Sequence, residues 1–321
     1  MAGAGVNMRK IGGRRRLVEE EGHRHAVKRG HTGILHFENL PFLKYILNLF
    51  LNITHTRSLG IKNALVVKPE EVKLMFTDLP AAFDNTRILF MPDLHIDALD
   101  GLTENIIRII EKSEFDLSIL GGDFTFGSGA DRSLACARMK DIVAALRSRS
   151  RVFGVLGNHD KYAIAEALAG LGVEMLLNEN VCLEKNSEKI YLAGMDDCHY
   201  YGADDLELAD AGITDSAFKI MICHSPEQYL KVESAGFDLY LTGHTHGGQV
   251  CLPGGGILVK GASVPRKILK GKWRYRSMTG YTSRGVGSTS LPVRFFCPPE
   301  MTFITLKRND GCGFLPTAIN N

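Results

Sequence analysis

The stretch "LTGHTHGGQV", residues 241–250, follows a short apolar run and ends beside a pair of glycines, with His244 and His246 two positions apart. Two interpretations are open. The histidines could be hydrogen-bonded residues of a polar turn after a strand, or they could be metal ligands. The choice depends on whether other strand-ending turns of the chain carry side chains of the same kind.

Four more segments have the same design, a short apolar strand that runs into a polar turn. They are "RILFMPDLH" (87–95), "FDLSILGGDF" (115–124), "RVFGVLGNHD" (151–160) and "FKIMICHSPE" (218–227). Helical patterns over 102–113, 131–147 and 161–170 lie between several of them. Strands that alternate with helices predict an α/β domain, which we place at residues 65–310.

The polar turns share one property, because each presents an oxygen or an imidazole where a strand ends. In such sheets, ligands collect at the carboxyl ends of strands. Mn²⁺, Fe²⁺ and Zn²⁺ accept this mixture of carboxylate, amide oxygen and imidazole without thiolate. The candidate residues are Asp93, His95, Asp123, Asn158, His159, His224, His244 and His246.

The ordered set "DLH", "GGD", "GNHD", "CHS" and "GHTH" resembles the calcineurin-like metallophosphoesterases over residues 85–308. The resemblance implies an α/β (α+β) fold of four layers, with a central β-sandwich flanked by helices. It also implies two divalent metal ions at the strand ends, with Mn²⁺ favoured and Fe or Zn as alternatives. The two histidines of the opening stretch would then face different metals, and the glycines after them would allow a tight turn.

The resemblance further implies a role for each ligand. Asp93, His95 and His246 would hold the first metal. Asn158, His224 and His244 would hold the second, and the carboxylate of Asp123 would bridge the two.

His159 follows the ligand Asn158, and the resemblance implies that it is the general acid that protonates the leaving group. The role of the next residue, Asp160, is open. It could orient His159, or it could cap the helix that begins with "KYAIAEAL".

Composition restricts the class of protein. The 321 residues are 45% hydrophobic and 23% charged, which is typical of a globular protein. The 38 basic and 36 acidic residues give a net charge of +2, so global charge predicts no specific nucleic-acid partner. The seven cysteines are odd in number and form no CxxC pair, which favours free thiols and a cytoplasmic location.

The two ends of the chain and the segment before the domain differ from the rest. We expect residues 1–33 to form a disordered basic arm and 311–321 a tail. Residues 34–64 contain "LPFLKYILNLFLNITHT", an amphipathic helical pattern with no run long enough to span a membrane. This helix could pack on the domain, or it could lie at the inner face of a membrane as a peripheral anchor.

Several residues are candidates for substrate binding. The stretch 253–276 has seven basic residues and no acidic one, so it could be a solvated loop or a phosphate-attracting rim with Trp273 as an anchor. Arg284 and Arg294 could bind phosphate, although packing or carboxylate pairing is equally open for both. We place His199 on the substrate rim.

The stretch "GVGSTSLPVRFFCPPE" (285–300) is similar to a membrane-associated bacterial subgroup of the family. That subgroup includes the lipid A pathway enzymes that cleave UDP-2,3-diacylglucosamine. The resemblance therefore implies hydrolysis of a phosphodiester or pyrophosphate in a lipid-linked substrate. The alternatives are a broad-specificity phosphodiesterase or nuclease on soluble substrates, and a catalytically silent binding module. Silent relatives lose ligands, and none of the seven expected here is missing.

Overall fold

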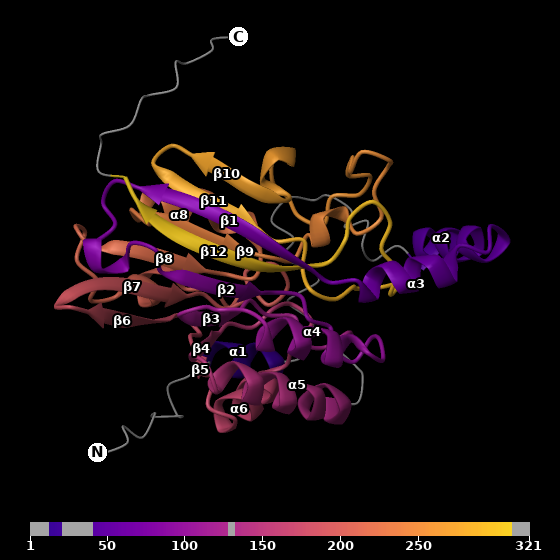
Figure 1. The fold of residues 1–321 in the computed structure, drawn as a ribbon, viewed down its shortest axis with the longest axis horizontal. Coiled ribbons are helices and arrows are strands. Elements are labelled where there is room, and N and C mark those ends of the chain that lie inside the picture. The colour runs from indigo at the N-terminus through magenta and orange to yellow at the C-terminus, as the bar shows by residue number, and fades with distance from the viewer. Residues whose placement is uncertain (1–12, 21–40, 128–131, 310–321) are drawn as a thin grey trace, which may run out of the picture.

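The computed structural model describes residues 13–20, 41–127 and 132–309 (Figure 1). Its centre is a pair of six-stranded mixed sheets. The first sheet has the order β1 (Lys68–Phe76), β12 (Glu300–Arg308), β2 (Arg87–Met91), β3 (Leu117–Leu120), β4 (Arg151–Gly154) and β5 (Glu174–Met175). The second has the order β10 (Gly271–Tyr275), β11 (Met278–Thr282), β9 (Leu239–Thr242), β8 (Phe218–Ile222), β7 (Glu188–Gly194) and β6 (Glu179–Lys185).

The two sheets pack face to face because their strands are apolar on both faces. Every residue of β3, β8 and β9 is buried, as expected for parallel strands that are covered on both sides. Side chains from both sheets form one core between them, including Phe90, Ile119, Ile222 and Leu241.

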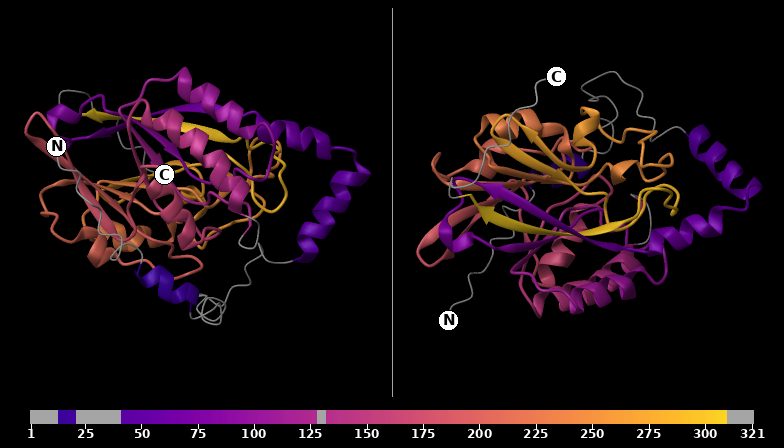
Figure 2. Two further views of the ribbon diagram at one scale, coloured as in Figure 1. Left: turned by 90° about the horizontal axis from the view of Figure 1, so that it is seen from below. Right: turned by 45° about the horizontal axis from the view of Figure 1, so that its top comes forward.

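Helices cover the outer faces. α4 (Leu102–Glu111), α5 (Arg132–Arg147) and α6 (Tyr162–Gly170) lie over the first sheet, as the view from below shows (Figure 2, left). α7 (Leu206–Asp210) and α8 (Tyr229–Ser234) pack on the second sheet. Short 3-10 helices occur at η2 (Ala81–Phe83), η3 (Pro226–Gln228), η4 (His246–Gly248) and η5 (Arg266–Ile268). The four-layer α/β prediction is confirmed.

The strand directions bring the predicted turns to one end of the sandwich. β2, β3 and β4 are parallel neighbours, and so are β8, β9 and β11, so within each group the carboxyl ends share an edge. The two edges meet, because the backbone N–H of His244, after β9, donates to the carboxylate of Asp93, after β2, at 3.0 Å. We call this end of the molecule the site end.

α2 (Pro41–Ile53) and α3 (Arg57–Leu65) project from the site end, as both Figure 1 and Figure 2 show. α3 is fixed to the domain, since Arg294 N–H donates to Gly60 O at 3.0 Å and a Cβ at Gly60 would lie 2.7 Å from the ring of Phe295. On α2, Leu51 is buried, whereas Tyr45, Ile46, Leu49 and Ile53 are exposed. In the described part of the chain, none of the helices has an apolar stretch of membrane-spanning length.

The prediction of a disordered arm over 1–33 is wrong for residues 13–20, which form the helix α1 (Gly13–Glu20). The reason is specific pairing, because Arg15 and Arg16 form ion pairs with Asp196 and Glu166 of the domain. The rest of that arm, residues 34–40 and the predicted tail 311–321 lie outside the described residues.

Candidate metal centre

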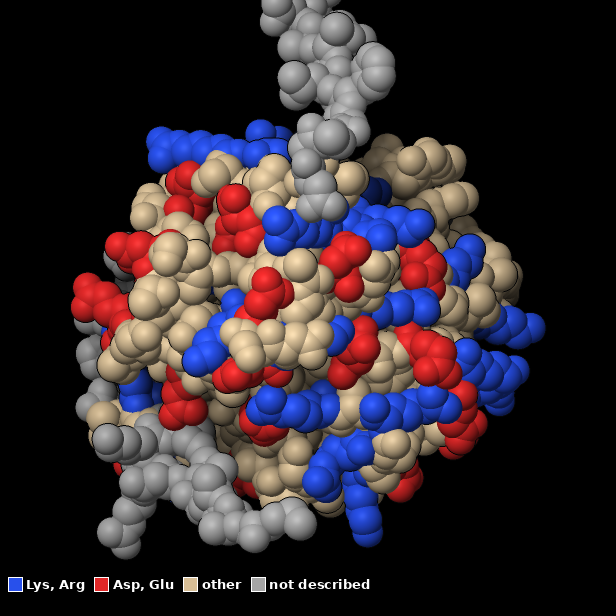
Figure 3. Space-filling view, turned by 60° about the vertical axis from the view of Figure 1, so that its left-hand side comes forward, with Lys and Arg blue, Asp and Glu red and all other residues tan. Residues whose placement is uncertain are grey.

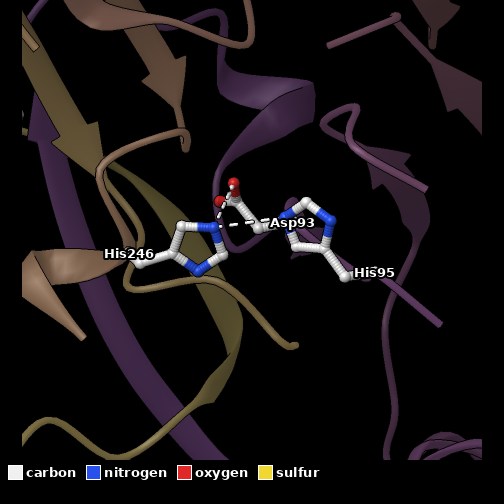
Figure 4. A group of neighbouring side chains, drawn as sticks. All are labelled: Asp93, His95 and His246. Atoms are coloured by element: carbon white, nitrogen blue, oxygen red, sulfur yellow. Dashed lines mark hydrogen bonds and ion pairs between the residues drawn. The ribbon is translucent and has the colours of Figure 1, made fainter. Parts of the chain in front are cut away.

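The first group of side chains is Asp93, His95 and His246, whose candidate ligand atoms all lie within 4.8 Å of one another. Asp93 and His95 follow β2, and His246 follows β9. His95 Nε2 lies 3.2 Å from His246 Nε2, and His246 Nε2 lies 3.3 Å from Asp93 Oδ1 (Figure 4). His95 Nδ1 lies 2.7 Å from the carbonyl of Thr125, so the ring directs Nε2 into the group.

The second group is Asp123, His224 and His244, within the same 4.8 Å limit. His224 Nε2 lies 3.2 Å from Asp123 Oδ2, and its Nδ1 lies 2.9 Å from the carbonyl of Gly121. Asn158 joins this group through its Oδ1, which lies 2.9 Å from His244 Nδ1. Thus the structure brings together all four residues that the sequence assigned to the second metal or to its bridge.

Asp123 lies between the two groups. Its Oδ2 is 3.2 Å from His224 Nε2 in the second group and 3.6 Å from His95 Nε2 in the first. A carboxylate in this place can contact two cations at once and reduce their mutual repulsion.

The histidines of the centre differ in their pKa values, and a bound cation would take the place of the proton that His224 otherwise holds beside the two carboxylates. Burial lowers the pKa of His95 to about 3 and the pKa values of His244 and His246 well below the ordinary value, so these imidazoles are neutral. Burial also lowers the pKa of His224, but the Asp123 and Asp93 carboxylates outweigh it and raise the pKa well above 6.5. Within the described chain, His224 Nε2 faces the carboxylates of Asp123 (3.2 Å) and Asp93 (3.7 Å) but makes no hydrogen bond of good geometry. A divalent cation would satisfy both this nitrogen and the buried carboxylates.

The backbone of the centre is strained. Five of its residues have left-handed backbone angles, namely Asp93 (φ 55°), His95 (37°), Asp123 (58°), His244 (69°) and His246 (49°). Each such residue typically costs about 1–3 kcal/mol, and such residues cluster at functional sites. After His246 the chain continues through Gly247 (φ 59°) and Gly248 (φ 89°), and glycine adopts such positive φ angles more readily than other residues. The two glycines therefore allow the tight turn that the sequence predicted.

Sequence reasoning missed the role of Asp160, which neither caps a helix nor orients His159. Lys161, not Asp160, precedes α6 as its cap residue. The Asp160 carboxylate accepts hydrogen bonds from the backbone N–H groups of Asp123 (2.7 Å), Phe124 (2.8 Å) and Gly157 (2.9 Å). It therefore ties the turn after β3 to the turn after β4. In the sequence, the only indication of a role for Asp160 is its position directly after His159.

His159 is the most accessible histidine of the centre, with a side chain that is 28% exposed. Its ring lies 5.1 Å from that of His95, centroid to centroid, and its Nε2 lies 4.0 Å from Asp123 Oδ2. Its backbone N–H donates to Asp123 Oδ1 at 2.9 Å, which fixes this residue relative to both groups.

Two of the substrate candidates, Arg294 and Trp273, are buried, and for Arg294 this is the packing role that the sequence left open. Arg294 is 0% exposed, and its guanidinium is surrounded by backbone carbonyls, including those of His246 (3.0 Å) and Arg284 (2.8 Å). Arg294 thereby positions His246, because its Nη2 also lies 3.1 Å from His246 Nδ1. Trp273 is 5% exposed and belongs to the core behind the second sheet, where its Nε1 donates to Thr282 Oγ1 at 2.9 Å.

The other two substrate candidates have different surroundings. Arg284 pairs with the carboxylates of Glu70 (2.8 Å) and Glu300 (2.5 Å), which is the carboxylate-pairing role that the sequence left open. His199 lies beside the second group, with its ring centroid 4.3 Å from that of His244 and its Nδ1 2.9 Å from Glu227 Oε2.

The basic stretch 253–276 does not form one rim. β10 runs away from the site end, since Gly271 pairs with Thr282 and Tyr275 pairs with Met278 at the far end of β11. Arg276, beyond β10, forms an ion pair with Glu233 of α8. The exposed Lys260, in a loop, and Lys267, in η5, lie closer to the site end. The segment that carries them contacts the turn after β9, since Gly261 O lies 2.9 Å from His244 Nε2 and Leu269 O accepts from Thr245 Oγ1 at 2.6 Å.

Comparison with known proteins defines the class. The chain belongs to the calcineurin-like phosphoesterase family, whose model matches residues 86–248. The uncharacterized metallophosphoesterase YkuE of Bacillus subtilis is 30% identical, over 71% of this chain and 82% of YkuE. The phosphodiesterase YaeI of Escherichia coli is 29% identical, over 72% of this chain and 84% of YaeI. The protein is therefore a metallophosphoesterase, and its two groups of side chains imply divalent metal ions.

Proposed function

We propose that the protein is a dinuclear metal-dependent phosphodiesterase or pyrophosphatase. Asp93, His95 and His246 hold one cation, and Asn158, His224 and His244 hold the other. The observation that carries this proposal is the position of Asp123 Oδ2, 3.6 Å or less from nitrogens of both groups. When bound, two divalent cations neutralise charge on the phosphoryl oxygens and lower the pKa of water. Mn²⁺ is the proposed metal, with Fe or Zn as alternatives.

His159 is the proposed general acid. Its ring lies beside His95 and is partly exposed, whereas the other histidines of the centre are buried. A substrate phosphate at the centre would place its leaving-group oxygen near this ring, and the imidazolium would donate the proton that the departing oxygen needs. His199, beside His244, is the proposed contact for the rest of the substrate.

A lipid-linked substrate at a membrane surface is the proposed substrate class, such as UDP-2,3-diacylglucosamine. The support is a set of exposed apolar side chains at the site end, which we call the apolar rim. Its members are Tyr45, Ile46, Leu49 and Ile53 of α2, Leu59 of α3, and Leu252, Leu258, Val259 and Phe296 of the loops. Exposed apolar surface of this kind, next to the cations Lys260 and Lys267, is typical of peripheral membrane binding.

A soluble phosphodiester is the second candidate, favoured by the similarity to YaeI. A nucleic acid is a further alternative. On the face away from the site end, basic and acidic side chains are interspersed, so that face has no continuous basic stripe that would track a phosphate backbone (Figure 3).

The test is a comparison of substrates with purified, Mn²⁺-loaded protein. We expect turnover of bis(p-nitrophenyl) phosphate, and faster turnover of UDP-2,3-diacylglucosamine in anionic vesicles than of an oligonucleotide. Water would split the pyrophosphate into two phosphomonoesters, which phosphorus NMR identifies. Equal or faster cleavage of the oligonucleotide would contradict the lipid proposal, and no turnover of any substrate would indicate a silent binding module.

A further inference from the structure

The helix α1 is attached to the domain beside the proposed metal centre by three consecutive arginines. Arg14 donates to the carbonyl of Asp204 at 3.1 Å, and Arg16 pairs with Glu166 of α6 at 2.9 Å. The side chains of Arg14 and Arg16 are each about half exposed, whereas that of Arg15 is 0% exposed. The middle arginine is thus inserted into the domain, and its neighbours hold the helix at the surface.

Arg15 contacts the turn that carries two of the proposed active residues. Its Nη2 donates to the carbonyls of Gly157 (2.8 Å) and Asp160 (2.7 Å), which stand on either side of Asn158 and His159. One guanidinium nitrogen therefore closes the turn across these two residues.

The environment of Arg15 is specific to a guanidinium. Its Nη1 donates to Asp196 Oδ1 at 2.8 Å, and its Cζ lies 3.4 Å above the centroid of the Tyr201 ring. Its Nε donates to Glu19 Oε1 at 3.2 Å, and the same oxygen accepts from the backbone N–H of Tyr162 at 2.8 Å. A planar group with donors in a fixed fork satisfies these partners at once, and a lysine ammonium cannot.

We propose that Arg15 is a positioning residue of the metal centre, through which the N-terminal helix fixes the turn that carries Asn158 and His159. This inference rests on the proposed roles of Asn158 and His159. The turn is held from two sides, because the Asp160 carboxylate ties it to the turn after β3 and Arg15 ties it to α1. If Arg15 is lost, the buried carbonyls of Gly157 and Asp160 lose its guanidinium donors. The buried Asp196 carboxylate keeps the backbone N–H of Asp197 but loses its ion-pair partner, and the turn relaxes.

The proposal predicts a larger effect on the second metal than on the first. Asn158 belongs to the second group, whereas Asp93, His95 and His246 are held by other turns. A general loss of folding would instead weaken both sites together. Removing a partner that orients metal ligands typically costs about 10–100-fold in metal affinity.

The experiment is a calorimetric titration of the metal-depleted full-length protein with Mn²⁺, for wild type, Arg15→Gln and Glu20→Gln. We expect two sites in wild type and in the control Glu20→Gln, a change at an exposed residue of the same helix. In Arg15→Gln we expect the Kd of the second site to rise about 10–100-fold and that of the first site to change much less. Hydrogen exchange at the amides of 158–160 should be faster in this variant alone. If Arg15→Gln does not fold, Arg15→Lys replaces it, with the same expected direction.

The outcomes separate the two proposals. A wild-type protein that does not bind two Mn²⁺ ions overturns the proposed function, whatever Arg15 does. The positioning role is overturned if wild type binds two Mn²⁺ ions and Arg15→Gln binds both with unchanged affinity. It is also overturned if both sites of Arg15→Gln lose affinity to the same extent. Selective loss at the second site, together with faster exchange of the turn, supports it.

Discussion

At the scale of single residues, His159 and the ligand histidines should respond differently to substitution. His159→Asn should keep both metals, since the ring is not part of either group, but should slow cleavage by about 10²–10⁴-fold. The loss should be largest for substrates whose leaving group most needs a proton. Steady-state kinetics on a series of aryl phosphodiesters measures this dependence.

The matched control is His55→Asn, a change at an exposed histidine between α2 and α3. We expect it to leave the rate on all soluble substrates unchanged. An undiminished rate of His159→Asn on the poorest leaving group would assign proton donation to another group.

Asp123 is the residue on which both metals depend. Asp123→Asn replaces an oxygen of the bridging carboxylate with an amide nitrogen and removes its negative charge, so both metal occupancies and the turnover should fall. Elemental analysis of the purified variant measures the occupancies, and Asp84→Asn, a change at a half-buried residue beside β2, is the control. Full occupancy of both sites in Asp123→Asn would refute a bridging role.

At the scale of elements, the turns after β3 and β4 must approach closely, and Gly157 allows this. A Cβ at Gly157 would lie 2.1 Å from Asp123 Oδ1. Gly157→Ala should therefore displace the bridging carboxylate, weaken metal binding and lower the free energy of unfolding by about 1–3 kcal/mol. Urea unfolding of the metal-free protein isolates the effect on stability.

Gly170→Ala is the matched control for this change. Gly170 lies in α6, and among the described residues a Cβ placed there meets no atom within 4 Å apart from its chain neighbours and the backbone of its own helix. The helix should gain about 0.5–1 kcal/mol from this substitution. If Gly157→Ala and Gly170→Ala changed the free energy of unfolding equally, the close approach at Gly157 would not contribute to stability.

The sequence was informative about the elements wherever a local pattern determines the structure. The helices at 102–111, 132–147 and 162–170 follow from apolar periodicity, and the ligand turns follow strands with continuous apolar runs. It failed where a polar residue is buried by distant partners. Arg15, Arg294 and Asp160 look like surface residues in the sequence, and only the fold supplies the carbonyls and amides that satisfy them.

At the scale of the whole molecule, the projecting α2–α3 pair, the loops of the apolar rim and the proposed centre all lie at the site end. We expect the protein to bind vesicles that contain anionic lipid, with an affinity that falls as ionic strength rises. The double change Ile46→Ser with Leu49→Ser should release it, as should Lys260→Glu with Lys267→Glu. Vesicle co-sedimentation measures both effects.

The control is Met75→Ser, an exposed apolar residue near the end of β1 that lies opposite the site end. We expect this change to leave vesicle binding intact. Binding that is absent, or that is reduced equally by all three changes, would remove the main support for a lipid-linked substrate and leave a soluble phosphodiester as the better proposal.

The central claim is that two cations act together in this centre, and metal stoichiometry tests it most directly. Protein stripped with a chelator, dialysed and reloaded with Mn²⁺ should recover its activity on bis(p-nitrophenyl) phosphate as elemental analysis approaches two metals per chain. Full activity with one metal per chain, or with none, would contradict the account.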